Sequence, residues 1–347
     1  MEKNLKNAID AYETFTKKSG IKNHGVQMKV VMINDAAFVG ETLLKYMPTE
    51  LEKQHIKRSR GFWDKTFGIA LKILRAKGDV YHVHYLLQDC YIASRLGKKP
   101  LIGHAHGSDL RDEIKKRKWG WIIKHNLRKC DKILVAQPTI LDTALEFNQT
   151  AEYFPIPFDP KAFFPKPLPP EREEKQVFIA STHNFRIKGT EKFLKALASL
   201  AAPVKIKSLA GGKNFAEAQQ LAKELGLQVD FVHKVLHDKM SELYWESDLV
   251  LGSFSIGQLD TVAIEAMACG RPVVHSVSRR YFKNCPLEEL ESVEETAEII
   301  QRLLVDKKER EQRVKSQLDY VDSTHSAPLL AERLLGIYGE LYADYKS

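Results

Sequence analysis

Seven prolines between residues 155 and 170 divide this chain of 347 residues into two parts. Proline fixes φ and lacks a backbone N–H, so a stretch this rich in proline cannot continue a helix or a central strand. A chain of this length is also longer than one hydrophobic core usually organises. We therefore expect a linker between two domains here. The prolines are Pro155, Pro157, Pro160, Pro165, Pro167, Pro169 and Pro170.

Short apolar runs alternate with helical stretches on both sides of this linker. This pattern is typical of buried parallel strands in a doubly wound α/β sheet. The sequence thus predicts two Rossmann-like domains, at residues 1–165 and 166–325, which face a cleft where ligands bind beyond the carboxyl ends of the strands. Residues 326–347 read as a helix that we expect to pack back on the first domain. The expected strands are 30–34, 80–84, 101–104 and 133–136, then 177–180, 204–210, 229–232, 249–251 and 273–275.

The N-terminal segment 1–27 is charged and amphipathic, and it does not resemble a secretory signal. It is expected to be an extra helix, or else to precede a start at Met28. No apolar run approaches the roughly 20 residues of a membrane span. The four cysteines lack the close spacing of metal sites, which predicts buried thiols in a cytoplasmic protein. They are Cys90, Cys130, Cys269 and Cys285.

Positive charge is concentrated in the first part of the chain. Residues 1–165 hold 28 Lys and Arg against 18 Asp and Glu, and the remainder holds 25 against 27. Within residues 113–129, four consecutive basic residues precede Trp119 and Trp121. This combination suits an anionic membrane surface, so we predict peripheral contact with the inner face of a membrane; a solvated face with its tryptophans in the core is the alternative. No nucleic-acid-binding module accompanies the charge, so nucleic acid is not an expected partner.

The string DTVAIEAMACGRPVV, residues 260–274, contains a helix that opens just after the expected strand 249–251. The N-terminus of a helix offers free N–H groups and the positive end of the helix dipole, which suits a diphosphate. One turn into the helix, Glu265 is placed to accept hydrogen bonds from a ribose diol. The small residues of the string allow the helix to pack closely on the sheet.

This string resembles the signature of the retaining nucleotide-sugar glycosyltransferases of the GT-B fold (glycosyltransferase family 4). In that signature, one glutamate is followed after seven residues by a second glutamate, then by AMACG and PVV. The resemblance implies that Glu265 is the second glutamate and holds the ribose, and that the amides of Thr261 and Val262 face the diphosphate. The chain departs from the family at two positions. Gly257 stands where the first glutamate would contact the donor sugar, and Asp260 replaces a customary glycine.

Two other segments extend the resemblance. The segment FRIKGT, residues 185–190, resembles the family's basic pair, which implies that Lys188 and Arg186 neutralise the leaving diphosphate; solvated basic residues on a loop are the alternative. The segment HAHGSD, residues 104–109, resembles the HG motif. It implies that His106 lies near the donor sugar, where an imidazole polarises a hydroxyl or supports charge at the reacting carbon. Asp109 is expected to orient His106, to bind the acceptor or to cap a helix.

Three loop positions complete the predicted site. Gly40 resembles the family glycine that lets the backbone approach the diphosphate and the acceptor, and Gly211 and His233 match loops that border the nucleobase. His82 and His84 are expected to be structural. Because the sequence contains no Asp-x-Asp, we predict neither a metal nor another cofactor.

The sequence therefore predicts a glycosyltransferase that moves a sugar from a nucleoside-diphosphate-sugar to a hydroxyl of a glycan or lipid-linked acceptor. The resemblance implies that the anomeric configuration is retained. One alternative is a nucleotide-sugar epimerase of the same fold. The other is a non-catalytic nucleotide-sugar-binding protein, which the glycine at position 257 favours.

Overall fold

The computed structural model describes residues 28–58, 67–233 and 235–347, which divide into two units. Unit 1 comprises the described residues up to Pro157 together with Ser326–Ser347, and unit 2 is Phe158–His325. The boundary thus lies at Pro157 rather than at residue 165, because the segment after Pro157 packs with unit 2. The Phe163 ring, for example, lies 5.2 Å from the His237 ring and 6.2 Å from the Tyr244 ring. The extra helix predicted at 1–27 lies outside the described residues.

Unit 1 is built on a six-stranded parallel sheet in the order β2-β1-β3-β4-β5-β6. Every residue of β3 and β4 is buried, as expected for central strands covered on both faces. The order reverses between β1 and β3, which makes the carboxyl ends of these two strands the switch point of the sheet. The strands are β1 (Lys29–Ile33), β2 (Glu52–Ile56), β3 (Val80–His84), β4 (Leu101–Ala105), β5 (Lys132–Val135) and β6 (Glu152–Tyr153).

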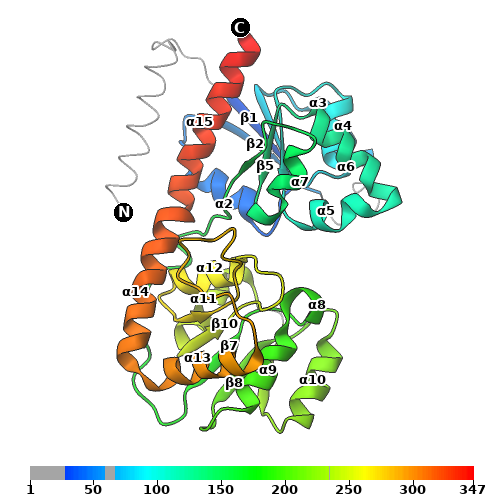
Figure 1. Ribbon diagram of the computed structural model, residues 1–347. Coiled ribbons are helices and arrows are strands. Elements are labelled where there is room, and N and C mark those ends of the chain that lie inside the picture. The colour runs from blue at the N-terminus through cyan, green and yellow to red at the C-terminus, as the bar shows by residue number, and fades with distance from the viewer. Residues whose placement is uncertain (1–27, 59–66, 234) are drawn as a thin grey trace. The chain divides into compact units, whose positions relative to one another are not determined.

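Helices cover both faces of this sheet (Figure 1). Apolar side chains of α3, α4 and α6 form one core cluster, and those of α2 and α15 form another. The final helix α15 is thus part of the core of unit 1, with Leu330, Leu334 and Tyr338 buried. The helices are α2 (Val39–Tyr46), α3 (Ile69–Arg75), α4 (Gln88–Arg95), α5 (Ser108–Arg111), α6 (Arg117–Lys129), α7 (Leu141–Leu145) and α15 (Ala327–Lys346), with 3-10 helices η2 (Glu113–Lys115) and η3 (Pro138–Ile140).

Unit 2 has a five-stranded parallel sheet in the order β11-β10-β7-β8-β9. When the strands are numbered along unit 2 alone, this is the strand order of a Rossmann sheet, with its first strand, β7, in the middle. The switch point of the sheet lies between β7 and β10. The strands are β7 (Gln176–Ile179), β8 (Lys205–Leu209), β9 (Val229–Val232), β10 (Leu249–Leu251) and β11 (Val273–Val274).

One face of the unit 2 sheet packs against α9, α10 and α13 through a continuous apolar cluster. The helix α12 begins at Thr261, after the N-cap residue Asp260, whose carboxylate caps it. It ends before Gly270, which has a left-handed φ of 70°. The helices are α8 (Phe185–Lys188), α9 (Thr190–Ala198), α10 (Phe215–Glu224), α11 (Met240–Glu246), α12 (Thr261–Ala268), α13 (Val293–Val305) and α14 (Lys307–Thr324), with the 3-10 helix η4 (His237–Lys239).

The predicted class of fold, two Rossmann-like α/β domains, is confirmed. Among the helices of the described ranges, none is both long enough and apolar enough to cross a membrane. All four cysteines are buried and free of disulfides.

Candidate functional site

The loop after β7 carries Lys188 to the switch point of unit 2. Asn184 caps the short helix α8, and Gly189 then turns the chain in the left-handed conformation, with φ 61°. A Cβ on Gly189 would lie 2.2 Å from Ser255 Oγ and 2.9 Å from Phe254 Cβ, so only glycine allows this close approach. Phe254 N donates to the Lys188 carbonyl at 2.7 Å. The loop after β7 is therefore fixed against the loop after β10.

Lys188 and Asp260 form an ion pair at this point. Lys188 Nζ lies 2.6 Å from Asp260 Oδ2, and the side chains are 25% and 17% exposed. The Asp260 carboxylate also accepts a hydrogen bond from the Ser253 hydroxyl and one from Ala263 N at 3.2 Å. Burial disfavours the carboxylate, but Lys188, His275 and the hydrogen bonds outweigh it and hold the pKa of Asp260 below its usual value. Asp260 is therefore ionised at neutral pH.

Glu265 is buried one turn into α12 and is held by two side chains of the same unit. His237 Nε2 lies 2.5 Å from Glu265 Oε1, and the Tyr244 hydroxyl donates to Oε2 at 3.1 Å. Burial raises the pKa of Glu265, although both hydrogen bonds oppose this. Burial lowers the pKa of His237, but the bond to Glu265 reverses that effect and leaves the pKa above its usual value. Each carboxylate oxygen has two lone pairs and takes part in one of these contacts, so Glu265 retains acceptor capacity for a diol.

The backbone at Gly257 adopts a turn that disfavours a glutamate side chain. Gly257 has a φ of 58°, and a Cβ would lie 3.1 Å from the backbone N and the Cβ of Ser278. Ser278 N donates to the Gly257 carbonyl at 2.9 Å, which fixes this turn. A side chain at this position would adopt a left-handed conformation against a close neighbour, which is strained.

The other residues predicted in unit 2 are exposed or half-buried. Arg186 is exposed on α8, whereas Thr261 and Val262 are half-buried as the first residues of α12. Gly211 has a φ of 111° with open space where a Cβ would be, and His233 is exposed, its ring 5.9 Å from the ring of Phe215. The predicted unit 2 residues nevertheless all follow the carboxyl ends of strands of one sheet.

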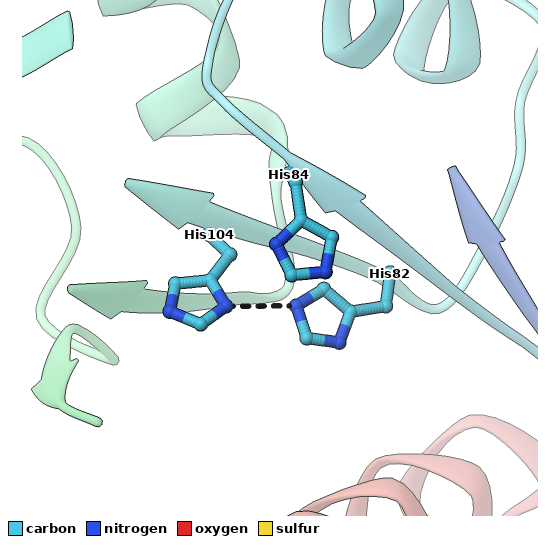
Figure 2. Close-up of side chains that lie close together, drawn as sticks. All are labelled: His82, His84 and His104. Carbon is cyan, nitrogen blue, oxygen red and sulfur yellow. Dashed lines mark hydrogen bonds between the residues drawn. The ribbon is translucent and has the colours of Figure 1, made fainter. Parts of the chain in front are cut away.

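A column of stacked histidine rings lies in unit 1. It comprises His82 and His84 on β3, His104 on β4, and His106, which follows β4. Neighbouring ring centroids lie between 4.4 and 5.3 Å apart. Figure 2 shows the hydrogen bond between His82 and His104, at 3.2 Å, with His84 stacked beside them. Burial lowers the pKa of all four, that of His84 to about 4, so the rings are neutral at pH 7.

This histidine column is better suited to hydrogen bonding than to holding a metal ion. Candidate ligand atoms of His82, His84 and His104 lie within 4.8 Å of one another, but zinc requires ring nitrogens that point at one centre about 2 Å away. The His82 and His84 rings are stacked at only 13°. Both His82 nitrogens are also engaged, by the Tyr338 hydroxyl at 2.7 Å and by His104. His106, the half-buried end of the column, is bonded through Nε2 to His84 Nδ1 at 2.9 Å.

Asp109 and Gly40 lie next to this column, and their contacts are with other residues of unit 1. The buried Asp109 carboxylate accepts from the amides of His106 and Gly107 at 3.1 and 3.0 Å, so it fixes the loop that carries His106. A Cβ on Gly40 would lie 2.7 Å from Met32 Sδ and 2.8 Å from His84 Nε2. Glycine at position 40 is therefore needed for packing on the column, and its N–H is bonded to Asp35 Oδ1 at 2.9 Å.

The predicted membrane segment 113–129 forms η2 and α6. Trp119 packs against the unit 1 core, whereas Trp121 is 56% exposed. The basic residues around Trp121 are exposed as well: Lys115, Lys116, Arg117, Lys118, Lys124, Arg128 and Lys129.

Sequence reasoning did not identify His237, Tyr244 or the role of Asp260. His237 and Tyr244 lie 28 and 21 residues before Glu265, on other elements, and no local motif links them to it. For Asp260, the sequence contained one indication of a special role: an acidic residue replaces a glycine that is expected to lie beside a diphosphate.

Comparisons with known proteins concern the sequence family and the fold. Residues 164–317 match the family model described as glycosyl transferases group 1. A curated relative, N-acetyl-alpha-D-glucosaminyl L-malate synthase of Bacillus anthracis, is 23% identical over 212 residues, and the match covers 56% of each chain. The chain thus spans little more than half the length of this relative.

Solved structures share the fold over most of the chain. Anabaena HepE in complex with UDP and glucose is similar, with a TM-score of 0.68 and 15% identity over 90% of this chain and 100% of that one. Sucrose-phosphate synthase from Thermosynechococcus elongatus also has a TM-score of 0.68, with 18% identity over 91% of this chain and 100% of that one. Residues 164–317, which make up most of unit 2, are therefore a group 1 glycosyltransferase domain, in a chain whose two Rossmann-like units have the GT-B type of fold.

Proposed function

We propose that the protein transfers a sugar from a nucleoside-diphosphate-sugar donor to a hydroxyl acceptor, with retention of the anomeric configuration. The observation that carries this proposal is the switch point of unit 2. There, a lysine and the N-terminus of α12 adjoin a buried glutamate, within a group 1 glycosyltransferase domain. An α/β sheet of this order binds ligands at its switch point. The UDP bound by Anabaena HepE is consistent with a nucleotide donor.

This proposal assigns tasks to the charged and polar residues of the predicted site. Lys188, assisted by Arg186, stabilises the negative charge that develops on the leaving diphosphate. The amides at the start of α12 hold the same diphosphate, and Glu265 accepts the ribose hydroxyls. Neutral His106, whose loop is fixed by Asp109, polarises a hydroxyl of the substrate or supports charge at the reacting carbon. The mechanism includes no metal and no other cofactor.

A donor screen tests the proposed function. The purified protein is incubated with radiolabelled UDP-, GDP-, ADP-, CDP- and dTDP-sugars and an extract that contains glycans and lipid-linked acceptors. We expect label from one donor to move into an acceptor. Conversion of a donor to its epimer would instead show an epimerase, and binding without turnover would show a nucleotide-sugar-binding protein. Either of these results contradicts the proposal.

We also propose that the protein is cytoplasmic and that the exposed basic face of α6, with Trp121, contacts an anionic membrane. In liposome flotation, the protein should float with vesicles that contain anionic lipid and remain behind with neutral vesicles. Replacing both Lys118 and Lys124 by glutamate should abolish flotation. Lys195 and Lys223, exposed on α9 and α10, provide the control, because the same double replacement there changes the net charge equally. Equal flotation by both double variants would contradict the membrane contact.

A further inference from the structure

The Asp260 carboxylate accepts hydrogen bonds from three groups of the kinds that hold a bound phosphate. Lys188 supplies an ammonium group, Ser253 a hydroxyl and Ala263 the N–H of the first turn of α12. Helix N-termini and lysine side chains are the groups with which α/β proteins hold phosphate oxygens. In the free protein, these groups are bonded to an anion of the chain itself.

A diphosphate and the Asp260 carboxylate cannot both occupy this position. Two anions beside one partly buried ammonium repel each other, and in such a site solvent screens the repulsion less than in water. Asp260 remains ionised at neutral pH, so protonation does not remove the conflict. Either the carboxylate leaves Lys188 when a donor binds, or the diphosphate is kept away from Lys188.

A buried histidine, His275, forms hydrogen bonds with the backbone of the loop that bears Asp260. His275 Nδ1 accepts from Ser253 N at 2.8 Å, and His275 Nε2 donates to the Gln258 carbonyl at 2.8 Å. The Asp260 side chain itself is 17% exposed, so a ligand can reach it from the surface. The backbone of the loop is thus fixed while the carboxylate remains accessible, which allows it to be displaced by a change of side-chain rotamer.

We infer that Asp260 is an internal competitor for the phosphate group of the donor: its carboxylate occupies the phosphate subsite of the free protein, and a nucleoside diphosphate binds by displacing it from Lys188. This inference rests on the proposed function, because it assigns a nucleoside diphosphate to the same subsite. It also gives the acidic residue at this glycine position a role, which is to weaken binding of the nucleotide product and of other anions.

Nucleotide affinity measures the competition directly. Binding of UDP, GDP, ADP, CDP and dTDP is measured by isothermal titration calorimetry for the wild type, Asp260→Asn and Asp260→Gly. Asparagine and glycine both remain acceptable helix N-caps, so α12 is retained. We expect both variants to bind the preferred nucleotide at least about tenfold more tightly, because a like charge beside the ligand has been removed.

Asp306→Asn is the matched control, because Asp306 caps α14 in the same unit through a 3.0 Å bond from Glu309 N. It should bind as the wild type does. Equal or weaker binding by the Asp260 variants than by the wild type overturns the inference and leaves the proposed function intact. If no protein binds any of the five nucleotides, the proposed function fails, and the inference fails with it.

A crystal structure of the wild type with the bound nucleotide provides a second test that requires no variant. We expect Asp260 to have left Lys188 and the ammonium to contact a phosphate oxygen. A bound nucleotide with the Lys188–Asp260 pair still intact would overturn the inference.

Discussion

Replacing Lys188 by alanine is expected to lower the turnover number at least about 100-fold while the fold is retained. In the proposed mechanism, negative charge develops on the leaving diphosphate beside this ammonium, which lies at the switch point of unit 2. Removal of one such preorganised charge or donor commonly costs two to three orders of magnitude in rate, roughly 3 kcal/mol or more. Single-turnover assays with the donor identified by the screen measure the loss.

The structure also requires a control for this experiment, because Lys188→Ala leaves the Asp260 carboxylate without its cation. An unpaired, partly buried carboxylate could itself repel the donor. The double variant Lys188→Ala/Asp260→Asn removes that effect. If the double variant stays as slow as the single variant, the lysine charge is responsible; recovery to the wild-type rate would remove Lys188 from the mechanism. Lys195→Ala, an exposed lysine of α9, should behave as the wild type.

Replacing Glu265 by glutamine is expected to weaken nucleotide binding about 10- to 100-fold. A carboxylate that accepts two ribose hydroxyls makes hydrogen bonds worth about 1.5–3 kcal/mol each, and an uncharged amide is a weaker acceptor. Glutamine has the same shape, so its contacts with His237 and Tyr244 remain sterically possible. Calorimetric titration of the preferred nucleoside diphosphate into both proteins measures the change.

The corresponding dideoxynucleoside diphosphate shows whether the loss arises at the ribose. The wild type should prefer the ribonucleotide, and Glu265→Gln should have lost most of that preference. An equal loss of affinity for both nucleotides would show that Glu265 does not contact the diol. Glu242→Gln, at a glutamate paired with Lys239 on the surface, serves as the control.

Much of the secondary structure could be predicted because the central strands are short apolar runs. The predicted ranges at 80–84, 229–232 and 249–251 coincide with β3, β9 and β10. Strand β2 was not predicted, because its sequence EKQHI contains one apolar residue and lies at the sheet edge. An edge strand needs fewer buried side chains, so hydrophobic periodicity does not reveal it.

The predicted site residues were found by local motifs, and their partners were not. Sequence indicated Lys188, His106 and Glu265 as chemically important residues. It did not indicate that Lys188 would be paired with Asp260, 72 residues later, since no spacing rule connects the loops after β7 and β10. Nor did it indicate that the carboxylate of Asp109 would accept from the amides of His106 and Gly107, which precede it in the chain.

By itself, the sequence determined most of the elements and the division into two α/β domains, because both depend on residues that are neighbours along the chain. Only the tertiary structure decided the strand order, the boundary at Pro157 and the pairing of Lys188 with Asp260. The physical reason is that a parallel sheet aligns the carboxyl ends of strands that are distant in sequence. Charges carried by separate loops meet there, and local periodicity contains no information about which loops become neighbours.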